Sequence, residues 1–385
     1  MGTSSEQLDR PSLVHEFDLD PIFREFYEWA DCHWPAADDA FENRLERAKR
    51  LVCRSRQREL YASSAKPTRM PVRAERAVCR FPQLFSPVYR RRDMTIERVA
   101  VTGGNGRIGT AILEAFGEHD YHTVDLARGK RREEVADEYR TTDLLDAGEV
   151  YGALAASDAD AVVHMGTIPS PRNHAGHTTF ESNAMSAYNV LEAASALDLD
   201  AVVLPSSINV MGADFQEAQT EVSYLPVDED HPLTPRDPYA LGKRTTEVLG
   251  AGFARRPDTP QVASLRYPWV ATSEELRAAY AEGDRSLSGL RESDWNGRST
   301  LFSYLHVEDA AAVARRAIEA DLDGHEAFWA VAADTNATVP SGRLATEIFP
   351  SVEVRGELDE HESLISIAKA RDLLDWEPER SWRNL

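Results

Sequence analysis

The stretch Val99–Thr110 reads VAVTGGNGRIGT and decides the fold that we expect for this chain. A short β-branched run breaks into glycines at Gly103, Gly106 and Gly109 and then resumes as a helical pattern, AILEAF. Glycine permits a tight turn and a close approach of the backbone to a ligand, and the first turn of a helix offers unpaired N–H groups to an anion. The stretch therefore predicts a strand, a pyrophosphate-binding turn and a helix, as in dinucleotide-binding proteins.

An acidic residue near the end of the next expected strand supports this interpretation. Asp125 lies in the run Tyr121–Leu126, 22 positions after Gly103. A carboxylate at about that distance accepts hydrogen bonds from the hydroxyls of an adenosine ribose. For the turn taken alone, the alternative that its glycines serve only a steric purpose stays open.

The hydrophobic pattern alternates between strands and helices from Met94 onward. The expected strands are Arg98–Val101, Tyr121–Val124, Ala161–Met165, Ala201–Leu204 and Val262–Tyr267. The expected helices between them are Ala111–Phe116, Ala147–Ala155, Ser182–Leu197 and Ala240–Ala254. Apolar strands joined by helical crossovers predict an α/β protein with a Rossmann-type, doubly wound parallel sheet covered on both faces.

After residue 270 the alternation becomes less regular. The expected elements there are helices at Ser273–Glu282, Val307–Ala320 and Leu364–Leu374 and a strand at Phe328–Ala332. We interpret residues 94–270 as the nucleotide-binding Rossmann domain and residues 271–385 as a smaller, mixed substrate-binding portion.

The formal charge of −22 is divided unevenly along the chain. Residues 94–385 contain 26 Lys and Arg against 50 Asp and Glu, whereas residues 1–93 contain 17 against 15. Lysines after residue 93 are confined to Lys130, Lys243 and Lys369. Because such an acidic surface stays hydrated when salt screens its self-repulsion, we expect a halophilic, cytoplasmic protein. A field of this sign repels phosphate backbones, so nucleic acid is not an expected partner.

Residues 1–93 form an N-terminal extension of uncertain status. Residues 47–93 are rich in arginine and interrupted by prolines, which predicts poor order. Met94 opens MTIERVAVTGG, so our hypothesis is that translation starts there; the alternative is a genuine linker with a short interaction module. No apolar run approaches the roughly 18–20 residues of a membrane span, and the widely spaced Cys32, Cys53 and Cys79 predict neither a disulfide framework nor a zinc site.

Tyr239 and Lys243, in the sequence YALGK, are the strongest candidates for chemistry. Four positions apart at the start of an expected helix, they lie on one face. An ammonium group near a phenol favours the phenolate, which lowers the pKa of a tyrosine toward the range of a general acid or base. Ser206 and Ser207 follow an expected strand, where a hydroxyl can orient a substrate alcohol; simple turn residues are the alternative.

Other polar residues leave two interpretations open. Asp143 is expected either to meet an adenine amino group or to cap a helix. His174 and His177 lack a third ligand nearby, so we expect no metal. We expect a packed, hydrogen-bonded role for His164. His306 and Trp269 are each expected to line the substrate side or to pack in the core.

Several motifs together resemble the extended short-chain dehydrogenase/reductase family, in its NAD-dependent epimerase/dehydratase group. VTGGNGRIG is similar to V-T-G-x-x-G-x-I-G, AVVHMG to V-V-H-L-A, ESNAMSAYNVLEAA to N-x-x-G-T-x-N-V-L-E-A-A, and PSSINVMG to S-S-S-x-x-V-Y-G. DEDHPLTPRDPYALGK resembles E-x-x-P-x-x-P-x-x-x-Y-x-x-S-K, and SYLHVEDAA and AKARDLLDWEPERSW are similar to F-I-H-V-D-D-x-A and K-A-x-x-x-L-G-W-x-P. The resemblance covers nearly all of residues 94–385.

The resemblance implies a role for each matching position. Tyr239 would move the hydroxyl proton, Ser207 would orient the substrate oxygen, and Lys243 would hold the nicotinamide ribose. The implied NAD-binding residues are Gly103, Gly106, Arg107, Ile108, Gly109, Asp125, Asp143, Leu144, Gly166, Tyr239 and Lys243. Asp125 points to NAD, because a carboxylate repels the 2′-phosphate of NADP; NADP stays open as the alternative, because the basic Arg128 and Lys130 follow closely. The family is usually a homodimer through two central helices.

Four positions depart from the family's nucleotide-sugar epimerases. Those enzymes usually carry Asn where Trp269 falls, Arg-Asp where Phe302 and Ser303 fall, and Tyr where Met211 falls. The loss of phosphate-binding groups favours a smaller sugar over a nucleotide sugar. We therefore expect an NAD-dependent dehydrogenase or epimerase that acts on a secondary hydroxyl of a sugar or nucleotide sugar; the alternative is a non-catalytic NAD-binding regulator.

Overall fold

The computed structural model describes residues 96–385 except 130–134, 214, 216–219, 282 and 293–296. The expectations for residues 1–93, Met94 and Lys130 therefore lie outside the described residues. A seven-stranded sheet of order β10-β7-β5-β4-β1-β2-β3 forms the centre of the described part. Its strands are β1 (Arg98–Thr102), β2 (His122–Ala127), β3 (Glu138–Thr141), β4 (Ala161–His164), β5 (Ala201–Ser207), β7 (Gln261–Tyr267) and β10 (His325–Trp329).

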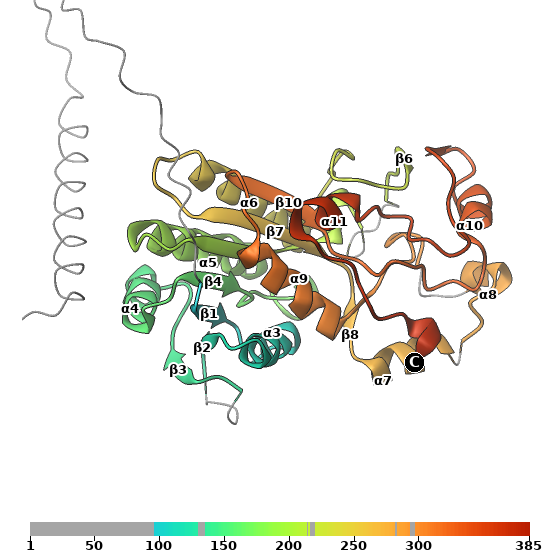
Figure 1. Ribbon diagram of the computed structural model, residues 1–385. Coiled ribbons are helices and arrows are strands. Elements are labelled where there is room, and N and C mark those ends of the chain that lie inside the picture. The colour runs from blue at the N-terminus through green and yellow to red at the C-terminus, as the bar shows by residue number, and fades with distance from the viewer. Residues whose placement is uncertain (1–95, 130–134, 214, 216–219, 282, 293–296) are drawn as a thin grey trace, which may run out of the picture. The chain divides into compact units, whose positions relative to one another are not determined.

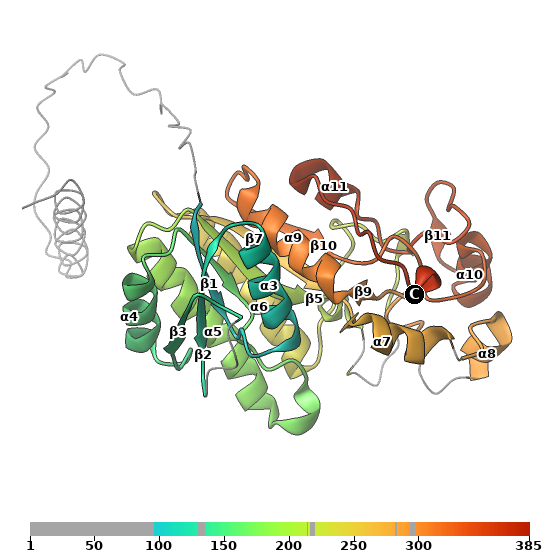
Figure 2. The same cartoon turned by 60° about the horizontal axis from the view of Figure 1, so that its bottom comes forward.

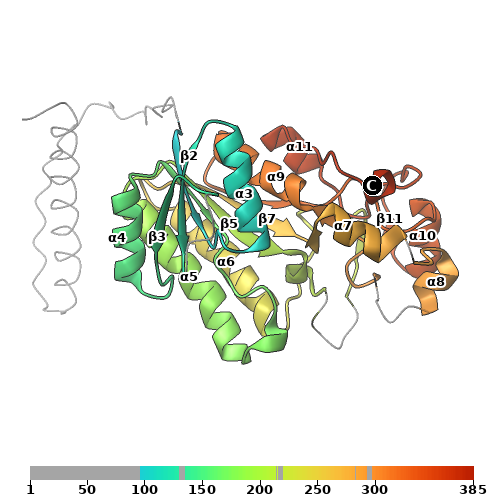
Figure 3. The same cartoon turned by 90° about the horizontal axis from the view of Figure 1, so that it is seen from below.

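All neighbouring strands of this sheet are parallel, and helices cover both faces. One face carries α4 (Ala147–Ser157), α5 (Gly176–Ala196) and α6 (Pro238–Ala254), and the other carries α3 (Arg107–Glu118) and α9 (Val307–Glu319), as Figure 1 and Figure 3 show. Successive residues of β1 belong to two separate hydrophobic clusters: Val99 and Val101 pack toward α3 and α9, and Ala100 packs toward α4 and α5. The expected Rossmann-type α/β fold is confirmed.

The remaining elements extend from the carboxyl ends of the strands (Figure 2). Two small parallel pairs join β6 (Tyr224–Leu225) to β11 (Glu353–Val354) and β8 (Val270–Ala271) to β9 (Leu305–His306). The helices here are α7 (Ser273–Leu276), α8 (Leu287–Glu292) and α10 (Ser341–Ile348), with a π-helical turn at Arg277–Ala281 and 3-10 turns at Pro171–Asn173, Ile208–Met211 and Trp382–Asn384. The last helix, α11 (Ala368–Leu374), instead packs against α9 and β10.

The strand expected at Phe328–Ala332 begins three residues earlier, at His325, and ends at Trp329. It pairs with β7 and so completes the central sheet, although we had expected it in the mixed substrate-binding portion. The helix expected at Leu364–Leu374 begins only at Ala368. The sheet thus takes its last strand from beyond residue 270.

Candidate active site

The glycine turn lies at the carboxyl end of β1 and packs backbone against backbone. Gly103 has a φ of +70°, and a Cβ there would lie 2.7 Å from the Cα and N atoms of Gly166. A Cβ on Gly109 would lie 2.2 Å from the carbonyl oxygen of Gly103. Gly106 is the N-cap of α3, and no side chain of the described residues caps this helix. The turn is therefore a backbone cradle at a helix N-terminus, which fits the pyrophosphate of a dinucleotide.

Two neighbours of the turn differ in what their side chains do. Leu144 is buried and packs on Gly166, the glycine after β4 that lies against Gly103. A Cβ on Gly166 would lie 2.2 Å from Leu144 Cδ1. The Arg107 guanidinium donates to the carbonyl oxygen of Val270 at 2.7 Å and pairs with Glu275. Arg107 therefore faces the substrate-side segment, and its backbone N–H is what it can offer to a pyrophosphate. The adjacent Ile108 is half-buried against the core.

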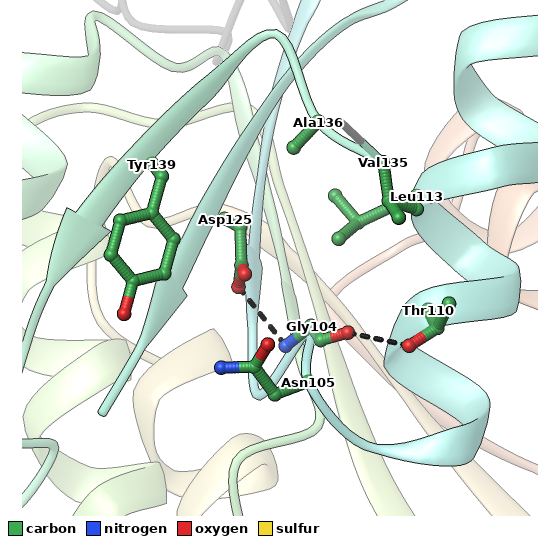
Figure 4. A pocket seen from close by; sticks show the side chains of 8 residues that line it. All are labelled: Gly104, Asn105, Thr110, Leu113, Asp125, Val135, Ala136 and Tyr139. Carbon is green, nitrogen blue, oxygen red and sulfur yellow. Dashed lines mark hydrogen bonds between the residues drawn. The ribbon is translucent and has the colours of Figure 1, made fainter. Parts of the chain in front are cut away.

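Asp125 lies beside the turn, in a pocket shown in Figure 4. Its carboxylate is buried and accepts a hydrogen bond from the backbone N–H of Gly104 at 3.1 Å. Burial raises the pKa of this carboxyl. The pocket is lined by Gly104, Asn105, Thr110, Leu113, Asp125, Val135, Ala136 and Tyr139. Asp125 can accept ribose hydroxyls here because it is held next to the phosphate cradle.

Asp143 follows β3 and is half-buried, with 47% of its side chain exposed. Its carboxylate accepts the N–H of Leu145 at 3.1 Å and lies 3.9 Å from the Arg128 guanidinium. The alternative that Asp143 caps α4 is wrong: Asp146 is the N-cap and accepts the first free N–H groups of the helix. Asp143 thus remains available to an adenine amino group.

The two serines at the end of β5 have different partners. Ser206 donates to Glu247 at 2.6 Å within the core. Ser207 donates to the side-chain oxygen of Asn209 at 3.0 Å and accepts the Asn209 backbone N–H at 3.2 Å. The structure thus assigns Ser206 to the interior, and Ser207 lies at the carboxyl end of the sheet.

Tyr239 and Lys243 lie on one face of α6, in its first turns. The Asp237 side chain caps the helix by accepting the N–H groups of Tyr239 and Ala240. Lys243 is 2% exposed, and its ammonium group lies 5.6 Å from the centre of the Tyr239 ring and donates to Thr167 Oγ1 at 3.0 Å. Burial lowers the pKa of Lys243 from 10.5 to about 7. A positive charge at this place stabilises a Tyr239 phenolate.

Sequence reasoning missed Thr167, the partner of Lys243. Thr167 directly follows Gly166, so its place just beyond the end of a central strand was the available signal. The same loop is held by Asn183, whose side chain both accepts from and donates to the backbone of Ile168.

His164 is the packed histidine that we expected. Its two ring nitrogens contact Thr102 at 2.7 Å and Ser186 at 3.1 Å, and burial lowers its pKa to about 3. His306 caps α9 and contacts Ser273, so it serves the core.

His174 and His177 are both exposed, and no three potential metal-ligating side chains gather among the described residues. Trp269 is 39% exposed and places its ring edge against Tyr280, 5.9 Å between centres.

A model of the NAD dependent epimerase/dehydratase family matches residues 99–330. The chain belongs to this family. Its cofactor is NAD, for which the glycine cradle and Asp125 provide a fitting site. None of the described helices has the length and apolarity needed to cross a membrane.

Relatives in this family act on sugars by different reactions. The chain is 29% identical over 231 residues to L-arabinose 1-dehydrogenase (NAD(P)(+)) of Haloferax volcanii, which covers 58% of this chain and 84% of the relative. It is 25% identical over 322 residues to UDP-glucose 4-epimerase of Rhizobium leguminosarum bv. trifolii, covering 74% and 94%. A short-chain dehydrogenase/reductase superfamily protein from Agrobacterium tumefaciens with bound NAD superposes with a TM-score of 0.54 at 22% identity, covering 74% and 94%. The likeness to that structure supports the fold.

Proposed function

We propose that this protein is an NAD-dependent dehydrogenase that oxidises a hydroxyl group of a free sugar. The observation that carries the proposal is the buried pair of Tyr239 and Lys243 on α6, a helix that packs against β5, the strand ending in Ser207. A non-catalytic NAD-binding regulator has no need of an acid/base tyrosine next to a buried ammonium group.

The proposed mechanism divides the work among these three residues. Ser207 hydrogen-bonds the substrate oxygen and orients it toward Tyr239. Tyr239 takes the hydroxyl proton, and the Lys243 ammonium stabilises the phenolate that makes this possible. NAD held by the glycine cradle and Asp125 would supply the hydride acceptor for the carbon that bears this hydroxyl group.

Two buried side chains support a free sugar rather than a nucleotide sugar. The resemblance placed the Arg-Asp of nucleotide-sugar epimerases at Phe302 and Ser303. Phe302 is 2% exposed, and the Ser303 hydroxyl donates to the Thr300 carbonyl at 2.7 Å. Neither side chain offers a charge to a diphosphate. The similarity to an arabinose dehydrogenase of Haloferax volcanii points the same way.

Cofactor retention tests this proposal against the epimerase reaction. An epimerase re-uses its NADH in place, whereas a dehydrogenase releases NADH and takes up NAD in each cycle. Protein purified without added cofactor is denatured, and the released nicotinamide is quantified by mass spectrometry. We expect far less than one nicotinamide per chain; a stoichiometric amount would contradict the dehydrogenase and support the epimerase.

We further propose a cytoplasmic homodimer that forms through α5 and α6. Large apolar side chains stand exposed on these two helices, where the sheet is already covered. They are Phe180, Met185 and Tyr188 on α5 and Leu241 and Val248 on α6.

A further inference from the structure

The face of α6 that carries the acid/base pair continues one turn further to Glu247. Tyr239, Lys243 and Glu247 are spaced by four residues, and all three are buried. A buried carboxylate needs partners, because removing it from water unpaired is unfavourable. Two of its partners, Ser206 and Arg266, are on the sheet.

Glu247 is bound from several sides at once. One oxygen accepts from Ser206 Oγ at 2.6 Å and from Arg266 Nε at 2.8 Å. The other accepts from Arg266 Nη2 at 3.1 Å and from Arg244 at 2.7 Å. The side chains of Glu247 and Arg266 are 1% and 4% exposed, so the bidentate pair lies in the interior. These contacts keep the pKa of Glu247 below its usual value, mainly through Arg266 and against the effect of burial.

Ser206 and Arg266, the two partners of Glu247 in the sheet, lie directly beside the candidate site. Ser206 of β5 and Arg266 of β7 are register partners, and the next pair is Ser207 with Tyr267. The Arg266 guanidinium also lies 4.6 Å from the ring centre of Trp329 on β10. One carboxylate thus joins α6 to β5 and β7, and through Arg266 to β10.

We propose that Glu247 is a positioning residue that fixes the Tyr239 phenol relative to the Ser207 hydroxyl. Glu247 holds the helix that carries Tyr239, and through Ser206 it holds the strand end that carries Ser207. A misplacement of about 1 Å between reacting groups costs on the order of a hundredfold in rate. This proposal rests on the proposed function of the Ser207, Tyr239 and Lys243 group.

A purely stabilising role would leave a different signature. Replacing both members of a buried ion pair by apolar side chains of similar size is often neutral for stability, whereas removing one member leaves a buried charge unpaired. A double variant can therefore keep the fold and still lose the directional contacts to Ser206. A lower turnover in such a variant would then reflect lost positioning and not lost stability.

The test is the double variant Glu247→Leu/Arg266→Met, compared with wild type and with Arg244→Gln. Arg244 is the half-exposed partner of Glu247, and its loss should change little. For the double variant we expect a melting temperature near that of wild type and a kcat at least about tenfold lower. Its Kd for NADH, measured by fluorescence titration, should stay within about threefold of wild type, because the glycine cradle follows β1 and β4, whereas Glu247 binds side chains of β5 and β7. A folded double variant with the kcat of wild type would overturn the proposal.

A second variant keeps the proposal testable if the double variant does not fold. Glu247→Gln keeps the size and one acceptor oxygen but loses the bidentate pairing. We expect its kcat to fall about tenfold with an unchanged KM for the sugar; a kcat within twofold of wild type would overturn the proposal. A wild-type enzyme without any sugar oxidation would instead contradict the proposed function, so the two failures are distinguishable.

Discussion

Lys243 carries a folding penalty that its proposed role in the candidate site explains. Lys243 is 2% exposed, and among the described residues its ammonium group donates to the hydroxyl of Thr167 and lies over the ring of Tyr239. Burial of a charge without a counter-charge disfavours the charged form, which is why the pKa falls to about 7. The folded chain therefore binds this proton less readily than the unfolded chain.

We predict that Lys243→Met raises the thermal stability of the cofactor-free protein at pH 7. Between pH 7 and 10.5 the unfolded wild type holds more protons at this residue, so wild-type stability rises with pH across that window. The advantage of the variant should be at least about 2–4 °C at pH 7, the effect of about 1 kcal/mol, and should shrink toward pH 10.5. Thermal melts at several pH values measure it.

Lys369→Met is the matched control. The Lys369 ammonium pairs with Glu326 at 2.7 Å, so its removal should lower the stability of the protein. Equal melting temperatures for Lys243→Met and wild type at every pH would show that the burial of Lys243 carries no penalty.

At the residue scale, the sequence predicted which side chains carry polar chemistry better than it predicted their partners. The choice between Ser206 and Ser207 came from a resemblance, and the physical reason appears only in the fold, where Glu247, 41 positions away, binds Ser206. The capping alternative for Asp143 failed because the N-cap of α4 lies three residues later, at Asp146. Both outcomes depend on contacts that no local pattern contains.

At the element scale, α3 contains two glycines in contrasting surroundings. A Cβ on Gly109 would meet the backbone of the glycine turn at 2.2 Å, whereas a Cβ on Gly117 would meet nothing within 4 Å. The first glycine is required by packing, and the second only weakens the helix.

We predict opposite effects of alanine at these two positions. Gly109→Ala should push the helix away from the turn and raise the Kd for NADH at least about tenfold, with a loss of stability of about 1–3 kcal/mol. Gly117→Ala should leave the Kd unchanged and add about 0.5–1 kcal/mol of stability through helix propensity. Fluorescence titration and denaturant unfolding test the pair, and equal Kd values for both variants would contradict the account of the turn.

Two strands at the margins of the central sheet, β3 and β10, differ from the prediction. β3 (Glu138–Thr141) reads EYRT, is only half-buried and so has no apolar run to reveal it. The apolar run Phe328–Ala332 predicts a strand, but β10 ends at Trp329. The next three residues, Ala330 to Ala332, are apolar because they are buried, although they lie beyond the strand. The central strands are buried on both faces and were recognised because such strands are continuous apolar runs.

At the scale of the whole molecule, the exposed apolar faces of α5 and α6 predict the proposed dimer. Met185→Glu together with Val248→Glu should convert it to a monomer, because each places a charge on a face that a partner would bury. Light scattering after size exclusion measures the mass. Tyr151→Glu, at an exposed residue on α4, is the control and should leave the mass unchanged. A wild-type protein that is monomeric at all concentrations would refute the dimer.

The acidic composition predicts a second property of the whole molecule. With a net charge of −22, repulsion between the acidic side chains opposes the compact state. Salt screens this repulsion: the screening length is about 10 Å at 0.1 M salt and about 3 Å at 1 M. We expect the melting temperature to rise between 0.1 M and 2 M KCl. Sucrose at matched osmolality should give a smaller rise, and a melting temperature that falls with KCl would contradict the proposed salt adaptation.

The most direct test of the central claim compares wild type with Tyr239→Phe. NADH formation is followed by absorbance with saturating NAD across a panel of free sugars and uronates, and NADH binding is followed by fluorescence in parallel. We predict that the variant binds NADH as wild type does and that its turnover falls at least about a hundredfold, because the phenol that takes the proton is gone. Turnover in Tyr239→Phe equal to that of wild type would contradict the mechanism.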